Sequence, residues 1–96
     1  MKKIFRTKLA EADFVDIWLY TYNNWGEVQA DKYIDELNKS LKILVEQPLI
    51  CRERKEFSPP VRIYRYLEHL IIYVIYGDEI KIIRVLHKSM DVENHI

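Results

Sequence analysis

Residues 8–47 carry two helical hydrophobic patterns in succession, separated only by Gly26. Apolar side chains three or four residues apart share one face of a helix, so each pattern predicts an amphipathic helix. Gly26 ends the first helix and Pro48 ends the second. Two helices joined so closely must fold back as a hairpin. The first stripe contains Ala10, Phe14, Ile17, Trp18, Thr21 and Trp25, and the second contains Ala30, Tyr33, Ile34, Leu37, Leu41, Leu44 and Val45.

The first stripe also predicts which other residues of this helix are buried and which are exposed. It predicts that Trp18 and Trp25 pack in the core, whereas Glu11, Asp13 and Asp16 fall off the stripe. Tyr20 and Tyr22 lie away from its centre, so they face either solvent or an interface.

The rest of the chain is typical of β-strands. Residues 2–7 predict a short N-terminal strand, and residues 61–66, 70–76 and 80–87 predict three more. Gly77-Asp78 forms a tight turn between the last two, and residues 49–60 form a polar loop. We therefore expect an α+β fold: an N-terminal strand, a helical hairpin, a three-stranded antiparallel meander packed on the helices, and a short C-terminal tail. A chain of this length is one domain, residues 1–96.

The central strand of this meander is apolar on both faces. Ile71, Tyr73 and Ile75 alternate with Leu70, Ile72, Val74 and Tyr76, and in the last strand Ile83 and Val85 oppose Ile80 and Ile82. The helical hairpin covers one face only, so something else must cover the second. The candidates are the N-terminal strand region, the C-terminal tail or another protein chain, because a large uncovered apolar patch marks a partner site.

Composition limits the classes of function. Fifteen basic and fifteen acidic residues give zero net charge, which argues against strong nonspecific binding to nucleic acid by this chain alone. The single cysteine forms no internal disulfide, and we see no secretory leader and no run long enough to cross a membrane. These features are typical of a cytoplasmic protein. The three histidines lack metal-ligand spacing, so we expect no metal and no cofactor.

A catalytic interpretation depends on Arg62, Arg84 and His87. His87 would transfer a proton at a strand end while the arginines hold a phosphate. The alternative is that His87 hydrogen-bonds nearby backbone and anchors the tail. Arg84 is expected on the side of Ile80, Ile82 and Leu86, in an intrachain salt bridge to Glu68 or Asp91. Arg62 and Arg65 face opposite sides of their strand, which weakens a shared pocket.

Four stretches together resemble the ParE-type toxins of the RelE/ParE superfamily, from bacterial type II toxin–antitoxin modules. They are LAEADFVDIWLYTYNNWG, QADKYIDELNKSLKIL before Pro48, EFSPPVRIYRYLEHLIIYVIYGDEIKIIRVLH, and the ending LHKSMD. The resemblance covers nearly the whole chain, and the ending is its most specific part.

The resemblance implies a bacterial cytoplasmic toxin that inhibits DNA gyrase by protein–protein contact, without chemistry, and that a ParD-like antitoxin neutralises in a hetero-oligomer. The antitoxin's disordered segment folds on binding, which suits a large apolar surface. Under this interpretation the tail docks on the target through His87, Lys88, Met90 and Asp91. The candidates for antitoxin binding are Tyr20, Tyr64, Tyr66, Tyr73 and Ile75. The alternative within the same superfamily is a RelE-like enzyme that cleaves messenger RNA on the ribosome, with Arg62, Arg84 and His87 as its catalytic residues.

Overall fold

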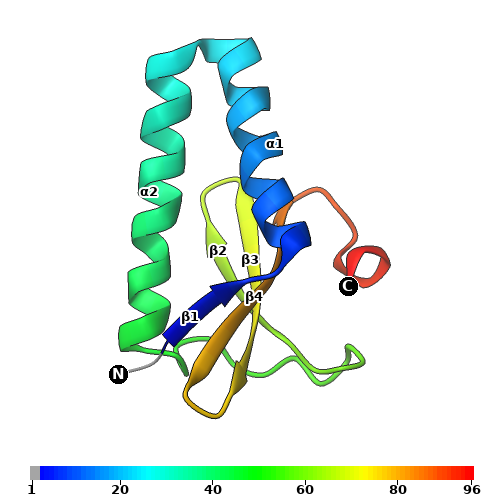
Figure 1. Ribbon diagram of the computed structural model, residues 1–96. Helices are drawn as coiled ribbons and strands as arrows, with labels where there is room; N and C mark the ends of the chain where they lie inside the picture. Colours follow the sequence, from blue (N-terminus) through cyan, green and yellow to red (C-terminus); the bar gives the residue numbers. More distant parts are fainter. Residues whose placement is uncertain (1–2) are drawn as a thin grey trace.

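A computed structural model of the chain describes residues 3–96 (Figure 1). Two helices pack against one face of a mixed sheet, which confirms the α+β architecture expected from the sequence. The sheet order is β1-β4-β3-β2. The elements in chain order are β1 (Lys3–Arg6), α1 (Lys8–Trp25), α2 (Glu27–Glu46), β2 (Arg62–Tyr66), β3 (His69–Tyr76), β4 (Glu79–His87) and the 3₁₀ turn η1 (Val92–His95).

The N-terminal strand joins the sheet at one edge. β1 pairs in parallel with the first half of β4, from Lys3 opposite Glu79 to Arg6 opposite Ile82. The strand expected over residues 2–7 is therefore present over 3–6, and residue 2 lies outside the described residues. Because β1 extends the sheet in its own plane, it covers neither face. β2, β3 and β4 form the expected antiparallel meander.

The hairpin forms as the sequence predicts. Thr7 caps α1, because its hydroxyl accepts from the Ala10 backbone N–H at 3.0 Å and donates to the Ile83 carbonyl at 2.8 Å. Gly26 separates the helices with φ of 90°, a value that side chains with a Cβ rarely adopt. The hairpin tip projects past the sheet (Figure 1). Trp25 at this tip is 65% exposed, so the prediction that it packs in the core was wrong.

The core between the helices and the sheet follows the predicted stripes. Leu37, Leu41 and Leu44 of α2 and Phe14 and Ile17 of α1 pack on the sheet residues Ile71, Tyr73, Ile80, Ile82 and Val85. Val85 was expected on the face of the sheet opposite to Ile80 and Ile82, but in the structure it lies on the same face. Ile72 pairs with Arg84 but Tyr73 pairs with Ile82, so Ile83 is an extra residue in β4. This β-bulge reverses the alternation of faces beyond it.

The second face of the sheet carries a smaller core. Ile72, Leu86 and Val61 are buried there, packed with Phe57 from the loop and Val92 from the tail. The tail was among the expected covers, and the loop over residues 49–60 was not. Leu86 lies in this cluster because of the bulge, and therefore not on the side of Ile80 and Ile82. The chain thus covers much of its own second face.

Candidate functional site

Two hollows flank the end of the sheet where β3 begins and β4 ends. The tail hollow, of about 490 Å³, is walled by Asp13, Asp16 and Tyr20 of α1, Arg84 and His87 of β4, and Met90 of the tail. The hairpin hollow, of about 420 Å³, is walled by Tyr20, Trp25, Tyr33, Glu68, His69 and His87. Both hollows share Tyr20, His69 and His87, so together they form one continuous concave surface beside α1.

His69 and His87 stand at the boundary between the hollows. They are register partners on β3 and β4, and their rings meet edge to face with centroids 5.6 Å apart. Nδ1 of His69 lies 2.6 Å from the Tyr33 hydroxyl of α2. Burial, together with the smaller effect of the neighbouring His87, lowers the pKa of His69 to about 4, while Glu68 opposes the shift. His69 is therefore neutral at pH 7, and a hydrogen bond joins its Nδ1 to the Tyr33 hydroxyl.

His87 holds the start of the tail through its own Nδ1. The Ser89 backbone N–H donates to this nitrogen at 3.1 Å, and the Ser89 hydroxyl lies 2.7 Å from it. A backbone N–H only donates, so Nδ1 is an acceptor and the neutral ring carries its proton on Nε2. Nε2 points toward the Glu68 carboxylate, 3.8 Å away. The prediction that His87 hydrogen-bonds nearby backbone is confirmed by this contact.

Lys88 is paired within the chain. Its Nζ lies 3.0 Å from the Glu68 carboxylate, and its backbone N–H donates to the Glu68 carbonyl at 2.8 Å. The hydrogen bond from Lys88 is the main reason that the pKa of Glu68 is below its ordinary value. Both side chains are exposed, so the pair positions the turn and contributes little to stability.

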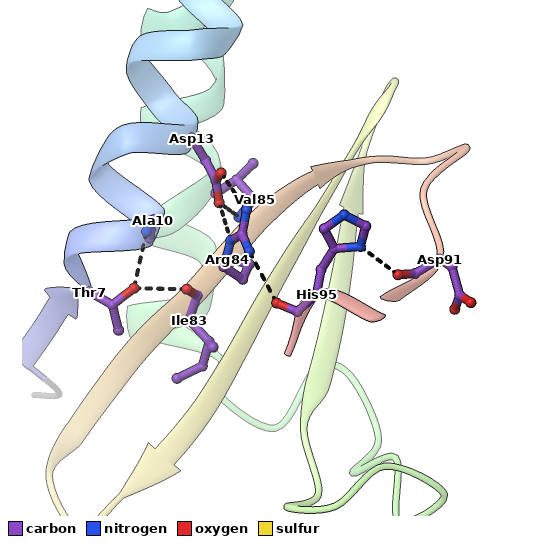
Figure 2. Close-up of polar contacts among 8 residues, drawn as sticks. All are labelled: Thr7, Ala10, Asp13, Ile83, Arg84, Val85, Asp91 and His95. Carbon is purple, nitrogen blue, oxygen red and sulfur yellow. Dashed lines mark hydrogen bonds and ion pairs between the residues drawn. The ribbon is translucent and has the colours of Figure 1, made fainter. Parts of the chain in front are cut away.

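Arg84 connects α1, β4 and the tail (Figure 2). Its Nε and Nη2 donate to the two carboxylate oxygens of Asp13 at 2.8 and 2.9 Å, and its Nη1 donates to the His95 carbonyl at 3.1 Å. The hydrogen bond to Asp13 is the main reason that the pKa of Arg84 is raised. The same carboxylate accepts from the Val85 backbone N–H at 2.9 Å. The expected salt bridge of Arg84 thus exists, but its partner is Asp13 rather than Glu68 or Asp91.

The catalytic set suggested by the sequence is divided between two places. Arg84 and His87 line the tail hollow. Arg62 lies on β2 at the opposite edge of the sheet, level with Tyr73, and its guanidinium donates to the Cys51 carbonyl. The structure therefore brings Arg84 and His87 together but leaves Arg62 outside their hollow.

The tail residues have different roles. Asp91 accepts from the Glu93 backbone N–H and the Asn94 side-chain amide, so its carboxylate shapes η1. Met90 is 46% exposed at the rim of the tail hollow. Among the residues singled out in the tail, Met90 therefore presents the freest side chain to a target.

The candidates for antitoxin binding lie in unlike surroundings. Tyr20 is 62% exposed and lines both hollows. Tyr64, Tyr66 and Ile75 are half-buried against the core between helices and sheet. Tyr73 is completely buried, burial raises its pKa to about 12, and its hydroxyl donates to the Pro48 carbonyl at 3.0 Å. A surface role for Tyr73 does not fit its burial.

Sequence reasoning missed the part that Asp13 plays. It was placed off the helical stripe, yet it is 8% exposed. A signal was available, because Asp13 lies three residues after Ala10 and four before Ile17, both of which are buried. A carboxylate on a buried face needs a cationic partner, and the arginine in the last strand supplies it.

Comparison with solved structures defines the class of fold. The chain superposes on the chromosomal ParDE toxin–antitoxin system from P. aeruginosa with a TM-score of 0.77. The match covers 91% of this chain and 96% of that one at 23% sequence identity, which shows a shared fold. Among the described residues, neither helix is long and apolar enough to cross a membrane.

Comparison with sequences defines the family. Residues 4–92 match the family described as the ParE toxin of the type II toxin–antitoxin system parDE. Toxin ParE1 of Caulobacter vibrioides is 32% identical over 96 residues, which are 100% of this chain and 99% of that protein. Toxin ParE1 of Mycobacterium tuberculosis is 34% identical over 88 residues, 91% of this chain and 90% of that protein. Toxin ParE of Escherichia coli is 30% identical over 87 residues, 88% of this chain and 84% of that protein. The chain therefore belongs to the ParE family of type II toxins.

Proposed function

We propose that this chain inhibits DNA gyrase in the bacterial cytoplasm by protein–protein contact, and that a ParD-like antitoxin neutralises it. The observation that carries this proposal is that Arg84, the arginine of the tail hollow, is bound on both sides by groups of its own chain. An arginine held in this way positions the tail and is not free to bind a phosphate. The hollows and the outer side of α1 supply the apolar, aromatic surface that a protein partner needs.

The tail is the proposed contact with gyrase. His87, Ser89 and Asp91 make the contacts that fold it, while Met90 projects beside them. An exposed methionine adapts to an apolar pocket on a partner because its side chain is unbranched and flexible. Lys88 lies at the same edge, with its charge paired to Glu68.

The test is a plasmid supercoiling assay with purified gyrase. Wild-type protein blocks supercoiling at a modest molar excess, and prior addition of the antitoxin encoded beside it restores supercoiling. Met90→Ala weakens inhibition several-fold, whereas Leu49→Ala, which truncates an apolar residue that is 70% exposed in the loop after α2, does not. Unaffected supercoiling at large excess of wild-type protein contradicts the gyrase proposal.

Transcript-end mapping after brief expression separates the RelE-like alternative. New ends within translated codons, lost in a His87→Gln variant, would establish ribosome-dependent cleavage instead. Under the gyrase proposal the messenger RNA stays intact while DNA breaks accumulate.

The proposed antitoxin surface is the outer side of α1 and the two hollows, where Tyr20 lies, together with Tyr64 and Tyr66 on the edge strand β2 and Ile75 on β3. Hydrogen exchange with and without antitoxin tests it. We expect slower exchange in α1 and over residues 61–87 in the complex, and unchanged exchange in both segments contradicts this surface.

A further inference from the structure

Asp16 is a carboxylate without a partner in the wall of the tail hollow. Among residues 3–96 no hydrogen-bond or ion-pair partner contacts the Asp16 carboxylate, and the side chain is exposed. Asp13, one helical turn away, is nearly buried and fully engaged by Arg84 and Val85. The two acids on the same stretch of α1 therefore differ, because Asp13 holds the fold together and Asp16 is available to bind a partner.

The surroundings of Asp16 suit a long side chain with a positive end. Tyr20 lies four residues later in α1, so its ring and the Asp16 carboxylate share one face of the helix. Ile17, Val85, Leu86 and Met90 add apolar lining to the same hollow. Arginine and lysine lay their methylene chains on apolar surface while the charged head reaches a carboxylate. Guanidinium also stacks on an aromatic face and pairs with a carboxylate through two N–H groups.

The other ionisable side chains that line the tail hollow do not neutralise the negative charge of Asp16. Arg84 is neutralised by Asp13 within the chain, and His69 is neutral at pH 7. The remaining ionisable lining consists of His87, whose Nδ1 already accepts from Ser89, and His95, whose Nδ1 lies 2.8 Å from the Asp91 carbonyl. The unmatched charge offered to a partner is therefore negative.

We propose that the tail hollow is a receptor for an arginine side chain of the partner segment, with Asp16 pairing with the guanidinium and Tyr20 stacking on it. This assignment deepens the proposed antitoxin binding and rests on it for the identity of the partner. It predicts that the segment carries an arginine flanked by apolar residues where it crosses α1.

The experiment compares two synthetic peptides on the isolated, isotope-labelled protein. The probe is acetyl-Leu-Arg-Leu-amide, and its control contains citrulline, which has the shape of arginine without the charge. We expect the arginine peptide to shift the Tyr20 and Met90 resonances saturably, with affinity about tenfold above that of the citrulline peptide. Asp16→Asn should abolish the preference, and Tyr20→Leu should weaken arginine binding about two- to fivefold.

Asp35→Asn on α2 is the matched control, because Asp35 is also an exposed aspartate on the hairpin, and it should leave the preference intact. Equal binding of both peptides, no saturable shift, or a preference that survives Asp16→Asn overturns the assignment. The peptide titration contains neither antitoxin nor gyrase. A negative titration therefore does not affect the conclusion from the supercoiling assay, and a negative supercoiling assay does not affect the conclusion from the titration.

Discussion

α1 and α2 pack side by side on the same sheet, yet the sides that they turn to solvent differ in chemistry. α1 exposes apolar and aromatic residues, which are Leu9, Val15, Leu19, Tyr20, Tyr22 and Trp25. α2 exposes mainly charged residues, among them Asp31, Lys32, Asp35, Lys39 and Lys42. A helix with one apolar face serves the core of its own chain, whereas further apolar residues on the side that faces solvent indicate a second partner.

The two helices of the hairpin therefore differ in role: both pack on the core, and only α1 also presents a surface suited to binding. Both contribute the inner side that the core needs, with Phe14 and Ile17 from α1 and Leu37 and Leu41 from α2. Only α1 adds an outer side suited to binding, and both hollows lie against it. α2 reaches the site through few residues, chiefly Tyr33 and its contact with His69.

The largest expected effect compares an inner leucine of α2 with an outer leucine of α1. Leu37 is completely buried, so Leu37→Ala should lower the free energy of unfolding by about 3 kcal/mol through lost burial and a residual cavity. Leu19 is 46% exposed, so Leu19→Ala should change it by less than about 0.5 kcal/mol. Urea denaturation measures both, and equal losses would contradict the division between the helices.

A smaller effect separates the two aspartates of α1. Asp13→Asn removes the charge that faces Arg84, so we expect a loss of about 2 kcal/mol in the free energy of unfolding. Asp16→Asn removes a carboxylate without a partner, and its expected effect is within about 0.5 kcal/mol. The same denaturation experiment applies, and a loss for Asp16→Asn as large as that for Asp13→Asn would refute the distinction.

The smallest effect concerns the contact that brings α2 to the site. Folding lowers the pKa of His69 from 6.5 to about 4, so between these values the unfolded chain binds more protons. The free energy of unfolding should therefore fall as pH falls from about 6.5 to about 4. Because His69 is only half-buried, we expect a total of about 1 kcal/mol rather than the full value of the shift.

The matched variant for this pH dependence is His69→Gln, which keeps a hydrogen-bonding side chain for Tyr33 but does not titrate. Free energies of unfolding at pH 7 and pH 4.5 should differ more in the wild type than in the variant. The two proteins differ at this one side chain, so the difference between them reports on His69. Identical pH dependence in the two proteins would show that His69 does not carry the effect.

Several parts of the fold were predictable because they depend on local pattern. The two helices begin and end where the spacing of apolar residues, Gly26 and Pro48 place them, and the strands of the meander follow from their apolar runs and the turn at Gly77. The contact of His87 with backbone also followed from its position at the end of a strand. Such features need only neighbours in the chain.

Other parts depended on contacts between distant segments. The partner of Arg84 is Asp13, 71 residues away, and the bulge at Ile83 decides which residues of β4 face the helices. Trp25 follows the helical stripe but lies at the tip of the hairpin, where it borders the hairpin hollow and stays 65% exposed. Tyr73 resembled the other tyrosines in sequence, and only its place under α2 and the loop distinguishes it.

The order of elements and the inner faces of the two helices were determined by the sequence alone, since periodicity and turn residues act within a few positions. The concave site was decided by tertiary structure. It exists because α1, the paired ends of β3 and β4, and the tail meet there. Asp13 pairs with Arg84 and Asp16 remains available to a partner because only Asp13 lies within hydrogen-bond distance of Arg84 once α1 packs on β4.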